Sequence, residues 1–141
     1  MRPMSCVLLV MAATACGPRE LRITMNSDNN SGQTGFAVVT DHGNKGLTIV
    51  IETSAPDFEG SQAVHVHNGT CGEVGPLRAP LLNLEVTGQQ PGRTGSTSPE
   101  VRKTDGSLLT LAELSKGEWL INVHDARDFG IYVSCGEIPH P

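Results

Sequence analysis

The sequence is poor in positive charge and lacks a long apolar run. It contains 10 lysine and arginine residues against 15 aspartate and glutamate residues, which gives a formal net charge of −5 at pH 7 over 141 residues. This acidic balance disfavours nucleic acid and anionic membrane surfaces as partners. The uncharged apolar stretch at residues 7–13 is much shorter than the roughly 20 residues that cross a bilayer as a helix. The sequence therefore does not predict a permanent transmembrane helix.

Several signatures of enzyme families are also missing. The sequence shows no Ser/His/Asp arrangement, no phosphate-binding glycine loop and no paired-carboxylate pattern, which argues against hydrolase and nucleotide chemistry. Helical periodicity is weak, and we find no internal repeat. The one segment that competes for helix is residues 108–116, which precede Gly117 and predict a single helical turn capped by that glycine.

The N-terminus has the layout of a bacterial secretory signal. Arg2 precedes the apolar stretch, and the small residues Thr14 and Ala15 precede Cys16. This ending resembles the lipobox of bacterial lipoproteins, which implies that residues 1–15 are removed and that Cys16 is lipidated. Ordinary secretion with cleavage nearby is the alternative. We expect an exported protein of the bacterial cell envelope, periplasmic or extracellular, that meets the membrane only through a lipid anchor.

The chain that remains has the length of one domain. Residues 16–33 are mostly polar apart from Leu21, Ile23 and Met25, so we expect a tether that leads into an edge strand. Residues 34–141 are then the folded domain.

Short β-rich runs dominate this domain. Residues 36–39 and 47–53 flank a turn with glycine and asparagine at residues 41–46, which predicts a hairpin. Further strands are predicted at residues 63–67, around 81–86, at 119–124 and at 130–135, and residues 88–99 are predicted to be an exposed loop. Short strands with frequent turns and almost no helix predict an all-β fold, an antiparallel Greek-key barrel or sandwich.

The four cysteines point to one disulfide. Cys6 lies in the predicted signal and Cys16 is assigned to the lipid, which leaves Cys71 and Cys135. Export to an oxidising compartment favours a disulfide between these two residues.

The histidines form a candidate metal site. Side chains alternate along a strand, so His65 and His67 share one face, and His124 shares a face with Asn122 on a later strand. The apolar residues that point to the opposite faces are Val64, Val66, Trp119, Ile121 and Val123. If the two strands are neighbours, three imidazoles meet on the outside of a packed wall. The alternative is that they are ordinary surface residues.

Three neutral nitrogens suit both copper and zinc, and the Irving–Williams order favours copper when both are available. Three protein ligands leave a position for water or substrate, as in catalytic centres. His42, in a predicted turn, and His140, near the end of the chain, could complete a copper site but are expected to be exposed polar residues.

Three segments carry a resemblance to known families. HVHNGTC at residues 65–71, NVHDARD at 122–128 and SCGEI at 134–138 resemble the pattern of copper/zinc superoxide dismutases. The same HxH, with Gly75 and Pro76 downstream and the NVH-to-GEI ending, also resembles the chordin-type (CHRD) domain. The resemblance covers roughly residues 34–139.

The resemblance implies a fold and a set of site residues. It implies a Greek-key barrel of the superoxide dismutase-like type with eight strands, copper ligands at His65, His67 and His124, and a disulfide between Cys71 and Cys135.

The sequence also departs from the dismutases. Between Asn68 and Leu120 there is no histidine, so the zinc loop and the bridging histidine have no counterpart and a second, zinc site is not expected. Tyr132 stands where dismutases have the arginine that guides the anion. Arg127, flanked by aspartates, is the candidate to replace it.

These observations predict an exported copper-binding, superoxide dismutase-like protein with one copper ion, whose partners are the metal and a small anion such as superoxide. One alternative is a non-catalytic copper-buffering lipoprotein, and another is a CHRD binding module without metal. The oligomeric state is left open.

Overall fold

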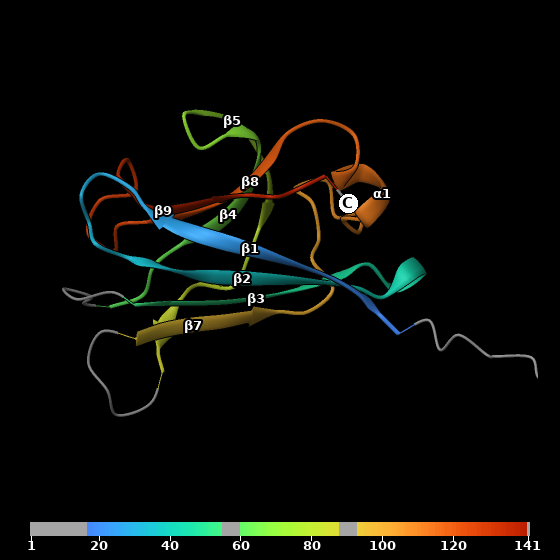
Figure 1. The fold of residues 1–141 in the computed structure, drawn as a ribbon, viewed down its shortest axis with the longest axis horizontal. Helices are drawn as coiled ribbons and strands as arrows, with labels where there is room; N and C mark the ends of the chain where they lie inside the picture. Colours follow the sequence, from blue (N-terminus) through green and yellow to red (C-terminus); the bar gives the residue numbers. More distant parts are fainter. Residues whose placement is uncertain (1–16, 55–59, 88–92, 141) are drawn as a thin grey trace, which may run out of the picture.

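The computed structural model describes residues 17–54, 60–87 and 93–140 (Figure 1). Within these ranges one antiparallel sheet has the strand order β5-β4-β8-β9-β1-β2-β3-β7-β6. The elements are β1 Arg19–Ser27, β2 Thr34–Asp41, η1 Gly43–Lys45, β3 Leu47–Ser54, β4 Val64–Thr70, β5 Glu73–Pro80, β6 Glu85–Val86, β7 Arg93–Ser98, α1 Leu111–Leu114, β8 Trp119–His124 and β9 Tyr132–Glu137. The predicted all-β antiparallel fold is confirmed.

The sheet is strongly curled into a half-barrel. Eight strands have six residues or more, and β6 has two. In Figure 1, β5 and β8 lie towards the top, β3 and β7 towards the bottom, and β1 and β2 between them. The strand predicted around residues 81–86 is reduced to β6 and an isolated bridge between Leu84 and Gln62.

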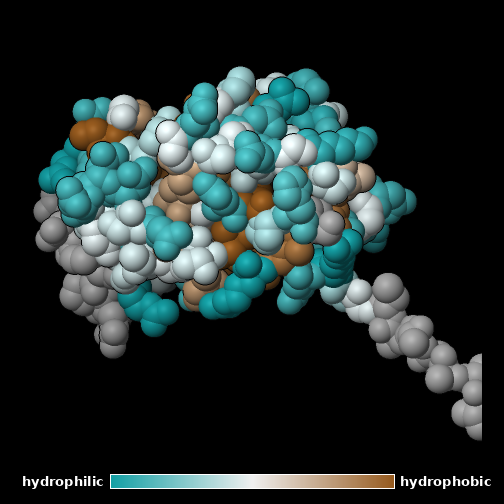
Figure 2. Space-filling model, turned by 45° about the horizontal axis from the view of Figure 1, so that its top comes forward, coloured by the Kyte–Doolittle hydropathy of each residue, from teal (hydrophilic) through white to brown (hydrophobic). Residues whose placement is uncertain are grey.

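The interior of the half-barrel holds the core. Alternate residues of the strands point inwards, as in β3, where Leu47, Ile49 and Ile51 have no exposed surface. A fully buried side chain of this size contributes about 1.5 to 3 kcal/mol relative to an exposed one. Figure 2 shows a face that is largely hydrophilic or neutral, with apolar atoms in a few separate areas. Among the described residues, the large apolar side chains that remain exposed are Leu77, Leu82, Phe129 and Ile131.

The prediction of a tether before residue 34 is wrong for residues 19–27. These residues form β1, which lies in the middle of the sheet between β2 and β9. Ile23 and Met25 alternate with polar residues and are buried, so the two-residue period outweighs the polar composition of the segment. Residues 1–16, which include the predicted signal and Cys16, lie outside the described residues.

The predicted loop at residues 88–99 is also wrong where it can be tested. Residues 88–92 lie outside the described residues, but Arg93–Ser98 form β7, paired with β3. The sequence analysis also missed β5, which contains Pro76 and Pro80. Prolines are tolerated there because β5 is an edge strand of the sheet.

The predicted hairpin and helical turn are confirmed. β2 and β3 pair along their length around the short helix η1. α1 is a single turn, as predicted, but its C-cap is Ser115 rather than Gly117. Its clearest signal is at the start, where Thr110 and Glu113 form a capping box. No helix in the described ranges has the length and apolar character needed to cross a membrane.

Candidate metal centre

Strands β4 and β8 are antiparallel neighbours, and their register brings the histidines together. His65 lies opposite Asn122 and His67 opposite Leu120. The backbone N–H of His124 donates to the carbonyl of Ala63 at 2.9 Å, so His124 extends the same face of the pair. The three histidines therefore lie on the face opposite the core, as the alternation predicted.

The three side chains form one compact cluster. One ring nitrogen from each of His65, His67 and His124 lies within 4.8 Å of the other two. Nitrogens that bind one ion at about 2 Å lie no more than about 4 Å apart, so modest rotations of the rings bring all three to binding distance. This group could hold a metal ion.

Backbone carbonyls fix the orientation of two of the rings. His67 Nδ1 donates to the carbonyl of Gly75 at 2.9 Å, and His124 Nδ1 donates to the carbonyl of Phe129 at 2.6 Å. Because a carbonyl only accepts, each Nδ1 carries a proton, and in the neutral ring each Nε2 then keeps a free lone pair. This is the arrangement typical of metal-binding histidines, whose second nitrogen donates to an outer partner.

Two observations test whether a metal fits. His67 Nε2 is buried and has no hydrogen-bond partner among the described residues. His124 Nε2 lies 2.9 Å from His65 Nδ1, and since His124 Nε2 has no proton, His65 Nδ1 donates to it. The donor atoms are thus neutral nitrogens that face one another, which suits copper and zinc.

Burial keeps His65 neutral. Burial, followed by electrostatic repulsion from His124 and from His67, lowers the pKa of His65 from its ordinary value of 6.5 to about 4. At pH 7 this imidazole is therefore in the neutral form that binds metals.

The site is more enclosed than the sequence analysis suggested. The side chains of His67 and His124 are buried, at 7% and 6% exposure, and His65 is half-buried. Leu120 and Asn122, on the outer face of β8, are fully buried too. The cluster is therefore covered on its outer side and reaches solvent at His65.

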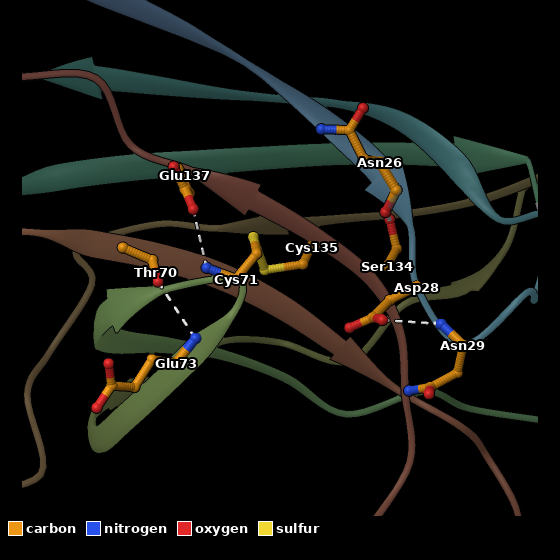
Figure 3. Close-up of a disulfide and its surroundings, with 9 residues drawn as sticks. All are labelled: Asn26, Asp28, Asn29, Thr70, Cys71, Glu73, Ser134, Cys135 and Glu137. Carbon is orange, nitrogen blue, oxygen red and sulfur yellow. Dashed lines mark hydrogen bonds between the residues drawn. A yellow bond between two sulfur atoms is a disulfide. The ribbon is translucent and has the colours of Figure 1, made fainter.

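The predicted disulfide contributes to this cover. Cys71, in the turn between β4 and β5, is bonded to Cys135 of β9, with 5.9 Å between the Cα atoms. In Figure 3, the side chain of Glu137 also accepts the N–H of Cys71. Since β8 lies between β4 and β9, the bridge anchors the turn across β8. A disulfide indicates an extracytoplasmic location.

Two glycines allow β5 to approach the histidine strand. A Cβ on Gly75 would lie 2.7 Å from the carbonyl oxygen of Asn68, and Gly69 has a φ of +104°. The β4–β5 register shifts between His67 and Gly69, which is a bulge-like irregularity of the kind that re-aims side chains. Gly75 therefore brings the carbonyl that accepts the His67 proton into place.

The loop after β8 and the first residue of β9 lie on the His124 side of the cluster. The Tyr132 ring packs edge-on against the His124 ring, with 5.0 Å between centroids. Arg127 is exposed, and its Nε lies 3.5 Å from Asp125 Oδ1. Hydrogen bonds from the backbone and side chain of Arg127 lower the pKa of Asp125. The charge of the predicted anion-guiding residue is therefore offset by a neighbouring carboxylate, and its role stays a prediction.

The remaining histidines lie apart from this cluster. His42 is exposed and bonds to Thr48, and His140 is exposed near the end of the chain. The carbonyls of Gly75 and Phe129 could not be predicted from the sequence, because backbone acceptors leave no signal in residue type.

Comparisons with known proteins identify a family. No curated protein and no solved structure matches the chain. The family model described as CHRD domain matches residues 12–130, which include all three histidines of the cluster and Cys71. The resemblance to the dismutase superfamily finds no support in these comparisons. The chain belongs to the CHRD domain family.

Proposed function

We propose that this protein is an exported CHRD-domain protein that binds one metal ion, with a preference for copper, through His65, His67 and His124. The observation that carries the proposal is the convergence of three imidazoles, two of them held by backbone carbonyls. His67 and His124 would bind through Nε2, and His65 through the Nδ1 that now contacts His124.

The donor set supports the preference for copper. Three imidazole nitrogens bind copper more tightly than zinc by the Irving–Williams order. A bound copper ion would supply one-electron redox chemistry. The chain's own contribution is to hold the rings, exclude solvent from His67 and His124, and leave the His65 side accessible.

The test is metal stoichiometry of the purified, oxidised full chain. We expect one equivalent of tightly bound copper, which is lost when all three histidines of the cluster are changed to alanine. The double variant His42→Ala/His140→Ala is the matched control, because it removes two exposed histidines outside the cluster. A well-folded protein without specific copper would refute the proposal and leave a CHRD binding module without metal.

A second candidate function is dismutation of superoxide to dioxygen and hydrogen peroxide. The accessible His65 side of the cluster favours it, because a small anion needs an approach to the metal. The net charge of −5 and the pairing of Arg127 with Asp125 oppose electrostatic attraction of an anion. We therefore rank metal binding or buffering first. A dismutase assay of copper-loaded protein separates the two, and loss of activity in Arg127→Ala would support a guiding role.

We also propose that Cys16 is lipidated and holds the domain at the cell envelope. The small residues before Cys16 support this. Mass spectrometry of the membrane-associated protein should find a diacylated N-terminal cysteine, and a Cys16→Ser variant should be released from the membrane.

A further inference from the structure

Asn122 is a buried polar residue beside the histidine cluster. It lies in the middle of β8, opposite His65 of β4 on one side and Cys135 of β9 on the other. Its side chain has no exposed surface. Neither Oδ1 nor Nδ2 has a hydrogen-bond partner among the described residues. Buried polar groups are rarely left unpaired, because each one loses its bonds to water.

Other buried carboxamides of this protein are paired. Gln33 Nε2 donates to Gln62 Oε1 at 2.8 Å, and Gln62 Nε2 donates back to Gln33 Oε1 at 2.9 Å. Gln33 also donates to the hydroxyl of Thr53. Both buried glutamine amides of the described residues are therefore paired, whereas the amide of Asn122, next to the candidate metal site, is not.

His65 lacks the outer partner that the other two histidines have. His67 and His124 each donate a proton to a backbone carbonyl on the side away from the cluster. His65 instead donates from Nδ1 to His124. When a metal takes that Nδ1, the proton of the neutral ring resides on Nε2, where a neighbouring oxygen can accept it.

Asn122 is placed to provide it. Residues directly opposite each other in an antiparallel pair have Cβ atoms about 4.5 to 5.5 Å apart, and Asn122 lies directly opposite His65 on the face that carries the histidines. We propose that Asn122 is a positioning residue of the metal centre, whose carboxamide oxygen accepts the proton of His65 when metal is bound. The inference rests on the proposed function, because it requires that the cluster binds metal.

The test compares Asn122→Leu with wild type by Cu²⁺ titration against a competing chelator. Loss of an outer hydrogen bond to a metal-binding histidine typically weakens metal affinity by 10- to 100-fold, and we expect a loss in that range with a changed Cu²⁺ electron paramagnetic resonance spectrum. The metal-free variant should unfold at the same or a higher urea concentration, because the leucine leaves no buried polar atom unpaired. Asn122→Asp keeps an acceptor oxygen and should restore most of the affinity.

Ser134→Ala is the matched control. Ser134 is fully buried on the adjacent β9, but its hydroxyl donates to the carbonyl of Asn26 (Figure 3). This change should lower the urea midpoint and leave copper affinity unchanged. Wild-type copper affinity and an unchanged spectrum in Asn122→Leu would overturn the inference but not the proposed function. Absence of copper binding in wild type would overturn both the inference and the proposed function.

Discussion

Removal of the disulfide should weaken both the fold and the metal site. In the variant Cys71→Ser/Cys135→Ser, the unfolded chain regains the freedom of a loop with a sequence separation of 64 residues. The chain-entropy relation gives about 4 kcal/mol for a loop of this length. Because domains of this kind are stable by about 5 to 15 kcal/mol, the variant should retain a reduced but measurable free energy of unfolding.

The effect on the metal site follows from the position of Cys71. The bridge anchors the turn that leads into β5, and Gly75 of β5 accepts the His67 proton. Without the bridge, this carbonyl is held by the β4–β5 ladder and by the contact of Glu137 with the turn. We expect copper affinity to fall by about 10-fold or more, as for other losses of an outer hydrogen bond.

Urea unfolding and Cu²⁺ competition titration measure the two effects separately. In urea unfolding without metal, wild type in a reducing agent should behave like the serine variant, which controls for the substitutions themselves. A loss of unfolding free energy below about 1 kcal/mol would contradict the chain-entropy estimate. Unchanged copper affinity in a folded variant would show that the disulfide does not hold the His67 partner in place.

Two glycine substitutions and the pKa of His65 give three further predictions. In Gly75→Ala, the new Cβ would meet a β4 carbonyl oxygen at 2.7 Å, so β5 should shift and copper affinity should fall at least several-fold. Gly72→Ala is the control, with nothing closer than 4.0 Å. Gly136→Ala would place a Cβ 2.7 Å from Met25 Sδ and should lower the free energy of unfolding by about 1 to 3 kcal/mol. The pKa of His65, near 4, implies that the metal-free protein loses stability as pH falls from 6.5 towards 4, because the unfolded chain then binds a proton that the folded chain does not.

Each of these predictions has a clear contrary result. Equal copper affinities in the Gly75 and Gly72 variants would mean that the carbonyl of β5 does not orient His67. Wild-type stability of the Gly136 variant would mean that β1 and β9 can separate without loss. The pH effect should disappear in His65→Asn, so an identical pH dependence of the urea midpoint in that variant would assign it to other groups.

The alternation of side chains explains why the histidine cluster could be predicted. His65 and His67 are two residues apart, so any strand through them places both on one face. The pairing of that strand with β8 was a condition of the prediction, and it is met by the register of His65 with Asn122. Spacing along the strands therefore predicted the cluster on the condition that the two strands are neighbours.

The elements that the sequence analysis missed are stabilised by their partners rather than by local preference. β7 reads Arg-Thr-Gly-Ser-Thr-Ser, a composition typical of a loop, and it forms a strand because β3 offers a buried neighbour. β5 contains two prolines and is stable only as an edge. Strand preference depends on cross-strand packing, which a single sequence does not display.

The enclosure of the site links metal binding to stability. His67 Nε2 and both polar atoms of Asn122 are buried without partners among the described residues, so the metal-free fold carries groups whose lost bonds to water are not replaced. A ligand that satisfies them binds the folded chain in preference to the unfolded one, so it raises the free energy of unfolding by mass action. The increase is about 2.7 kcal/mol when the free ligand concentration is 100 times the dissociation constant. Because the rings of His67 and His124 are already oriented by carbonyls, little of the binding free energy is spent on ordering them.

Copper should therefore raise the urea midpoint of wild type and leave that of the triple-alanine variant unchanged. Equal shifts in both proteins would place the bound copper outside the cluster.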